Sequence, residues 1–364
     1  MGVLTALAIL AGLIVVHEAG HFLAATWQGI RVSGFSIGFG PALLQRRRGG
    51  VLYALRAIPL GGYVSFPDDE DPEVSPFRGD DPHLLRNRPL AQRALVIAAG
   101  VLANLALAWA VLLAQGLVLG IPAGFSTGPG VLVAAVQPGQ PAARAGLQAG
   151  DRIVALQGQE LGGGQQAVSD LVDRIRQSPD LRLAIAAERQ GERQQLWLVP
   201  DDQSGVGRIG AQLQPNGSEL FRSPRSPLEP IRQANADFWA LTNRTVSGFG
   251  ALLTHFGETA SQVSGPVKIV EMGASLADQG GSSLFMFTAL ISINLAVLNA
   301  LPLPLLDGGQ FLLLLIEGLR GRPLPLHFQT AFLQSGFVFL VGLSLVLIVK
   351  DTSQLPVIQQ LLAR

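Results

Sequence analysis

The chain has 364 residues, and its 26 Lys and Arg balance its 26 Asp and Glu, so the formal net charge is zero. Charged residues make up only 14% of the chain and hydrophobic residues 48%, whereas an ordinary globular protein is about 25% charged. A soluble protein of this length could not cover its surface with so few charges, which indicates an integral membrane protein. Zero net charge argues against a nucleic-acid partner, and the absence of Cys excludes disulfides, thiolate metal sites and cysteine nucleophiles.

Four apolar stretches predict transmembrane helices, and the chain is expected to lie in a lipid bilayer. They cover residues 1–27, 94–121, 284–306 and 328–349, and a short polar insert interrupts only the first. Each has about the 20 residues that a helix needs to cross the hydrocarbon core. Four spans place both termini on the same side of the membrane. We therefore predict a polytopic α-helical membrane protein.

The segments between the spans differ sharply in composition. Residues 123–200 contain short alternating strands and one amphipathic helix, which is typical of a soluble mixed α/β domain. Residues 229–262 repeat apolar residues at helical spacing with charges on the other faces, which indicates an interfacial amphipathic helix too polar to span. The predicted parts are a membrane part over 1–122, the soluble domain over 123–200, a polar linker over 201–228, the amphipathic helix over 229–262 and a second membrane part over 263–364.

The polar insert in the first span is the sequence His17-Glu18-Ala19-Gly20-His21. Positions i and i+4 lie on one face of a helix, so two imidazoles can hold one cation. The Glu beside the first His can reach a metal-activated water and take its proton. Ionisable side chains inside a membrane span are costly, so a cluster of three is a functional-site candidate. The sequence predicts a catalytic zinc site there.

Zinc held by two His needs a third protein ligand if the fourth position is left for water. Asp307 directly follows the third span and is the natural candidate. Pro302 and Pro304 prevent a regular helix, so Asp307 is expected on unwound backbone at membrane depth, which is tolerated where it is buried or lines a wet cavity. We predict that Asp307 is the third ligand.

These motifs resemble those of the bacterial site-2 proteases, which are intramembrane zinc metalloproteases. The resemblance rests on HEAGH at 17–21, FSIGFGP at 35–41, IPLGGYV at 58–64 and NALPLPLLDGG at 299–309. It implies that His17, His21 and Asp307 bind Zn²⁺ and that Glu18 is the catalytic base. It also implies that Asn299 helps to hold the substrate or the oxyanion.

The same resemblance assigns substrate-binding residues. Residues 31–65 are similar to the membrane-associated β-hairpin that the family uses to extend a substrate strand, which places Gly61 and Gly62 in the substrate site. The sequence GVLAN at 100–104 resembles a second-span motif that includes Asn104, although Val101 stands where Pro is common. The implied substrates are single-pass membrane proteins already trimmed by another protease, such as anti-sigma factors, or remnant signal peptides.

The segment from Pro138 to Ile153 resembles part of a PDZ domain, a fold that binds peptides by strand addition. A peptide or substrate tail is therefore an expected partner, although a steric cap without a ligand is an alternative. Two other function classes remain open: a zinc transporter, and a metal-free membrane scaffold that carries a PDZ domain. The transporter gives no reason for Glu18 beside a ligand.

Basic residues predict the orientation, because short Lys/Arg-rich loops stay in the cytoplasm whereas long domains cross regardless of charge. Residues 31–93 carry nine Arg, and Arg320 and Arg322 lie between the third and fourth spans. We therefore expect a protein of the bacterial inner membrane with its termini and PDZ domain extracytoplasmic. The zinc site is expected near the cytoplasmic side.

Overall fold

The computed structural model describes residues 2–67, 80–189, 191–203, 205–254, 265–279 and 281–353. The chain divides into two units. The membrane unit comprises residues 1–120 and 224–351, and the inserted unit comprises residues 121–223 with 352–364.

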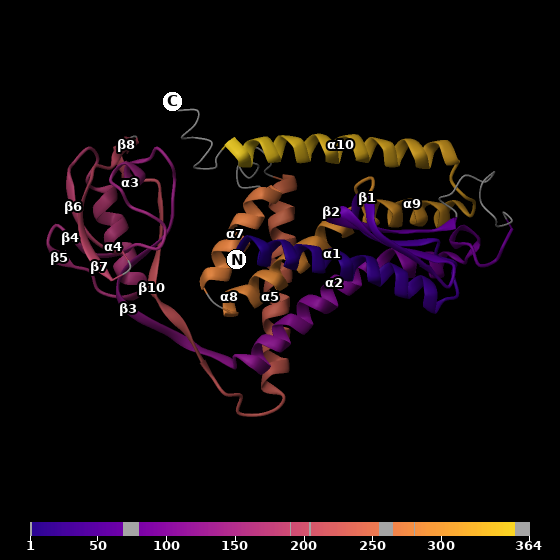
Figure 1. Cartoon of the computed structure of the whole chain (residues 1–364), viewed down its shortest axis with the longest axis horizontal. Helices are drawn as coiled ribbons and strands as arrows, with labels where there is room; N and C mark the ends of the chain where they lie inside the picture. The colour runs from indigo at the N-terminus through magenta and orange to yellow at the C-terminus, as the bar shows by residue number, and fades with distance from the viewer. Residues whose placement is uncertain are drawn as a thin grey trace. The chain divides into compact units, whose positions relative to one another are not determined.

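Four described helices of the membrane unit are long and apolar enough to cross a bilayer (Figure 1). They are α1 (Gly2–Trp27), α2 (Leu90–Val118), α8 (Gly281–Ala300) and α10 (Leu326–Ser353). Their number and order match the predicted spans. The third ends six residues before the predicted limit of 306, because Pro302 and Pro304 cannot continue a regular helix.

Three other helices of the membrane unit are shorter or more polar: α5 (Glu229–Thr254), α7 (Pro266–Gln279) and α9 (Asp307–Arg320). The start of α5 agrees with the predicted amphipathic helix, and residues 255–262 of that prediction lie outside the described residues. Neither α7 nor α9 is predicted from the sequence as a separate helix. The helix α9 matters most for the site, because it begins at Asp307.

The helix α2 is central to the packing of the membrane unit, since it contacts α1, α5, α8 and α9. Its Ala108 and Leu112 are buried against Ala234 of α5 and against Ala289 and Ile293 of α8. Small residues let helix backbones approach closely, which is the usual basis of helix association in a membrane. The same helix passes both histidines of α1.

The predicted hairpin is formed by β1 (Gly34–Arg48) and β2 (Val51–Ser65). Gly34 pairs with both Leu52 and Ser65, so the start of β1 lies between the two ends of β2. The guanidinium of Arg56 donates to three oxygens at 2.7 Å, namely Ser36 Oγ, the Gly40 carbonyl and Tyr63 Oη. These bonds tie together backbone segments on both strands of the hairpin.

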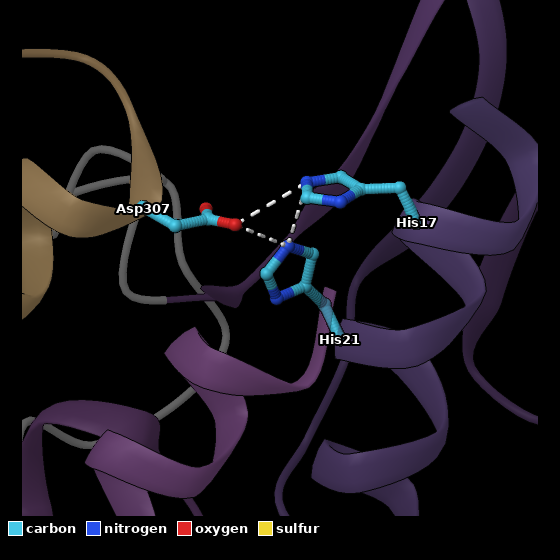
Figure 2. A group of neighbouring side chains, drawn as sticks. All are labelled: His17, His21 and Asp307. Atoms are coloured by element: carbon cyan, nitrogen blue, oxygen red, sulfur yellow. Dashed lines mark hydrogen bonds and ion pairs between the residues drawn. The ribbon is translucent and has the colours of Figure 1, made fainter. Parts of the chain in front are cut away.

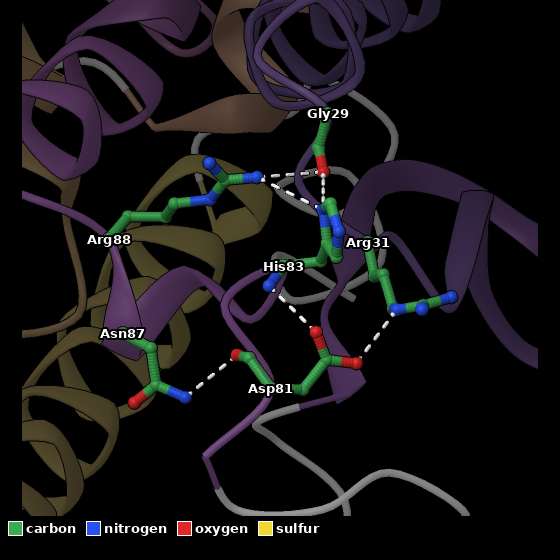
Figure 3. Close-up of polar contacts among 6 residues, drawn as sticks. All are labelled: Gly29, Arg31, Asp81, His83, Asn87 and Arg88. Carbon is green, nitrogen blue, oxygen red and sulfur yellow. Dashed lines mark hydrogen bonds and ion pairs between the residues drawn. The ribbon is translucent and has the colours of Figure 1, made fainter.

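A polar cluster joins the chain just after α1 to the segment that leads into α2 (Figure 3). Asp81 accepts hydrogen bonds from Arg31 Nε at 3.1 Å and from the His83 backbone N–H at 2.8 Å. Arg88 Nη2 donates to the Gly29 carbonyl at 2.9 Å, and His83 Nδ1 lies 3.0 Å from the same oxygen. The cluster therefore fixes the start of α2 against the end of α1.

The inserted unit contains an antiparallel sheet with the strand order β10-β3-β4-β6-β7, to which β5 (Gln159–Glu160) adds at β4. Its main strands are β3 (Ile121–Val136), β4 (Arg152–Leu156), β6 (Leu183–Arg189), β7 (Glu192–Leu198) and β10 (Ala211–Arg222). The unit also contains the short helix α3 (Pro141–Arg144) and the longer α4 (Gly164–Arg176). Val168, Leu171 and Ile175 of α4 are buried with side chains of the sheet in one core.

The structure differs from the expected polar linker over 201–228. Residues 201–222 contain β8 (Asp201–Gln203), β9 (Val206–Arg208) and the edge strand β10. Polar residues dominate β10 because an edge strand is half exposed, and such a pattern resembles a linker in the sequence. The inserted unit therefore extends beyond the expected limit of 200.

Candidate metal and active site

The structure brings together the three predicted metal ligands (Figure 2). His17 and His21 lie one turn apart on α1, and Asp307 is the first residue of α9. The Nε2 atoms of the two imidazoles are 3.3 Å apart, and each is 3.3 Å from Oδ2 of Asp307. These residues are the only group of three or more possible metal ligands found among the described residues.

The triangle of ligand atoms fits a tetrahedral metal ion. Zinc binds His nitrogen and carboxylate oxygen at about 2.0–2.2 Å, which in a tetrahedron separates neighbouring ligand atoms by about 3.3–3.5 Å. The three observed separations agree with that value. Apart from its contacts with the two imidazole nitrogens, the buried Asp307 Oδ2 has no hydrogen-bond partner, and a buried oxygen of this kind calls for an ion. The donor set leaves one tetrahedral position for a reacting molecule.

The outer nitrogen of each imidazole contacts α2. His21 Nδ1 lies 2.8 Å from the Val96 carbonyl, to which it can only donate a proton. That bond fixes the tautomer in which Nε2 is free to bind a metal. His17 Nδ1 faces the side-chain amide of Asn104 at 3.2 Å, and Asn104 is fully buried. Both histidines are thus oriented from the same neighbouring helix.

Gly100 of α2 lies directly against the two rings. A Cβ at this position would be 2.3 Å from His21 Nε2 and 2.7 Å from His17 Cε1. No side chain fits at such distances, so glycine is required for the close approach of α2. The residue lies one turn from Val96 and one turn from Asn104, on the same face of the helix.

Asp307 is held by an irregular turn, residues 301–306, between α8 and α9. The prediction of unwound backbone is correct for this turn but wrong for Asp307, which belongs to the first turn of a helix. Leu305 in the turn has φ +75°, a strained conformation for a bulky side chain. A Cβ at Gly308 or Gly309 would lie 2.0–2.3 Å from backbone oxygens of residues 300–303, so α9 starts in tight contact with the turn.

Of the remaining predicted residues, Asn299 lies near His17 and Gly62 lies near Glu18. Asn299 Nδ2 lies 3.5 Å from His17 Nε2. A Cβ at Gly62 would lie 3.2 Å from Cγ of Glu18, so β2 passes directly over the glutamate. Gly61 has φ +112° and lies against the ring of Phe39. Close packing therefore explains why glycine occupies both positions. Contact of these glycines with a substrate stays a prediction.

The comparison with protein families agrees with this geometry. A family model described as Peptidase family M50 matches residues 5–343. The chain belongs to peptidase family M50. The match includes both histidines of α1, Asp307 and residues 121–223 of the inserted unit.

Relatives of this M50 chain match over nearly its full length. A protein of Nostoc sp., named as a candidate zinc metalloprotease, is 49% identical over 98% of this chain and 97% of its own. The chloroplastic membrane metalloprotease ARASP of Arabidopsis thaliana is 43% identical over 99% of this chain and 80% of its own. A solved PDZ domain of an SdrC-like protein from Listeria monocytogenes is 25% identical, covers 24% of this chain and 90% of its own, and has a TM-score of 0.21.

Proposed function

We propose that this M50 peptidase is an intramembrane zinc metalloprotease that cleaves peptide bonds in or near the transmembrane segments of single-pass membrane proteins. The observation that carries the proposal is the triangle of His17, His21 and Asp307 ligand atoms, with sides of 3.3 Å, inside a bundle of apolar helices. The names of the relatives support zinc as the metal and proteolysis as the activity.

The positions of the residues support the following proposed roles. Zn²⁺ would supply Lewis-acid activation of water and of the scissile carbonyl. Glu18, beside the ligand His17, accepts the proton that the attacking water loses and passes it to the leaving nitrogen. Asn299 lies close enough to His17 Nε2 to orient the carbonyl oxygen of the substrate. Asn104 keeps His17 in place from behind.

The substrate must present an extended segment, because backbone hydrogen bonds shield the peptide bonds of an intact transmembrane helix. The part of β2 that contains Gly61 and Gly62 passes over Glu18 and is the proposed receiving strand. Strand addition would supply the backbone hydrogen bonds that the unwound substrate loses. Anti-sigma factors and remnant signal peptides are candidate substrates of this type.

We also propose that the inserted unit is a PDZ domain that binds a peptide or substrate tail. A cavity of about 1020 Å³ lies between α4 and the edge strand β10. Its lining includes Val172 and Ile175 of α4 and Leu213 of β10. A groove of mixed apolar and polar lining beside the edge strand of the described sheet suits an extended peptide. The proposed location is the bacterial inner membrane, with this unit and both termini outside the cytoplasm.

The test separates proton transfer from metal binding. Glu18→Gln should abolish cleavage of a transmembrane substrate in the purified full-length protein while about one zinc per chain stays bound. His21→Phe and Asp307→Asn should lose both cleavage and zinc, because they remove ligands. Zinc is measured by atomic spectroscopy and cleavage by fragment yield.

Glu271→Gln, a change at an exposed residue of α7, is the matched control and should leave both readouts unchanged. Full cleavage by Glu18→Gln would contradict the protease mechanism. A wild-type protein that binds zinc but cleaves no transmembrane substrate would favour the transporter.

A further inference from the structure

Glu317 is a buried carboxylate in the membrane unit that the proposed chemistry does not use. It lies on α9, and its side chain is only 6% exposed. Its Oε2 accepts a hydrogen bond from Arg93 Nη1 at 2.9 Å. Its Oε1 accepts from the backbone N–H of Leu324 at 3.0 Å and from Gln329 Nε2 at 3.3 Å. One carboxylate thus joins α2, α9, the turn after α9 and the start of α10.

A buried ion pair adds little to stability by itself, because the cost of removing two charges from water offsets their attraction. Three partners, on α2, on α10 and in the turn between α9 and α10, indicate a role in geometry instead. Removing one member of such a pair leaves an uncompensated buried charge and moves the elements that it joined. The role of the Arg93–Glu317 pair therefore depends on which elements it holds in place.

The helix that Glu317 fixes is the helix that carries Asp307. The two residues are ten positions apart on α9, which is about 15 Å at 1.5 Å per residue. Close contacts of Gly308 and Gly309 with the preceding turn hold the first end of the helix. Glu317 holds the other end, so a rotation or slide of α9 is prevented at two points. A shift of α9 would carry the Asp307 oxygen with it.

Arg93, the other member of the pair, lies in the first turn of α2. It precedes by one turn Val96, whose carbonyl faces His21 Nδ1 at 2.8 Å. The ion pair therefore joins the helix that carries the third ligand to the helix that orients a histidine ligand. Direct contacts between α2 and α9 complete this connection.

We propose that Glu317 is a positioning residue: through Arg93 it holds α9 in register with α2, and so keeps the Asp307 oxygen at bonding distance from the metal. The inference rests on the proposed function only in taking the bound ion to be zinc. It predicts that the ion pair controls metal affinity although neither residue contacts the metal.

Glu317→Gln is the central variant, because an amide oxygen can still accept the Leu324 N–H whereas the ion pair is lost. In the purified full-length protein we expect zinc affinity, measured by competition with a chelator, to fall about 10- to 100-fold, the effect usual for residues behind metal ligands. The visible absorption of the cobalt-loaded protein should change as well, since it reports the arrangement of the ligands. Glu188→Gln breaks a more exposed ion pair, with Arg152 in the inserted unit, and is the control. It should leave both readouts unchanged.

Two further variants make the test independent of folding defects. Arg93→Gln should match Glu317→Gln, and the double variant should be no worse than either single variant, because residues of one ion pair act as a unit. Arg93→Lys keeps the charge but loses the planar fork, and it provides the test if Glu317→Gln does not fold. It should weaken zinc binding with the fold retained.

Unchanged zinc affinity and an unchanged cobalt spectrum in any folded variant would overturn the inference. Wild-type protein that binds no zinc would contradict the proposed function instead, so the two failures can be told apart.

Discussion

Replacing Gly100 with alanine tests the structure of the site most directly. In a membrane helix that had room, Gly→Ala would remove an unfavourable residue and stabilise the helix by about 1 kcal/mol. At Gly100 the structure predicts the opposite. The new Cβ would lie 2.3 Å from His21 Nε2 and 2.7 Å from His17 Cε1, whereas ordinary non-bonded carbon contacts are about 3.5–4.0 Å. The rings or α2 must therefore move by about 1 Å.

The size of this movement sets the expected effect. Metal–ligand distances vary by only about 0.2 Å in well-formed sites, so a shift of about 1 Å cannot be absorbed at constant geometry. Forcing a methyl group into a packed interior costs about 1–3 kcal/mol. If that energy falls on the metal-bound form, zinc affinity drops about 5- to 150-fold, since 1.4 kcal/mol is a factor of ten.

The assay compares zinc affinity in Gly100→Ala, wild type and Gly12→Ala. Gly12 is on α1, the helix of both histidines, and a Cβ there would meet nothing within 4 Å. The control variant should bind zinc as wild type does and should be no less stable. If Gly100→Ala also bound zinc with wild-type affinity, α2 could not pack against the imidazoles as the structure has it.

Two other predictions concern the inserted unit and the orientation. Asp151 is buried, and although burial alone would raise its pKa, hydrogen bonds from Arg189 and the Gln148 backbone lower it below the ordinary value. The stability that Asp151 contributes is therefore complete above about pH 4 and is lost as the pH falls through its lowered pKa. Hydrogen exchange of the β6 and β7 amides should show this acid dependence in wild type but not in Asp151→Asn. The substitution should lower the free energy of unfolding by roughly 2 kcal/mol. The same pH dependence of exchange in wild type and variant would contradict the prediction. Because the chain has no Cys, single cysteines at positions 47, 191 and 321 can be labelled with a membrane-impermeant maleimide in sealed cells. We expect only the cysteine at position 191 to react. Reaction at position 47 or 321 would show the opposite topology.

Much of the site could be predicted from the sequence, because its ligands obey local rules. His17 and His21 are four residues apart, and the apolar residues on both sides of them indicate the continuous helix that puts them on one face. The prolines before Asp307 predict a break in the helix at membrane depth. The sequence therefore identified all three members of the observed cluster, although it placed Asp307 outside a helix.

The contacts behind the ligands could not be predicted in the same way. The partner of His21 is the Val96 backbone carbonyl, which has no signature in the side-chain sequence. Arg93 and Glu317 are 224 positions apart. In the sequence each is only a charged residue near the end of an apolar stretch, so their pairing could not be predicted. The edge strand β10 was missed for a similar reason, since its polar residues become interpretable only when β3 lies beside it.

The helix α2 shows why a span with no metal ligand of its own can set the geometry of the site. Arg93, Val96, Gly100 and Asn104 follow one another at intervals of three or four residues, which places them along one face. In that order they meet the helix of Asp307, the outer nitrogen of His21, both imidazole rings and the outer nitrogen of His17. Each contact alone would affect one or two ligands. Because a single rigid helix makes all four contacts, a displacement of α2 disturbs every ligand together. We therefore expect the three ligands to leave the metal in one step and not one at a time.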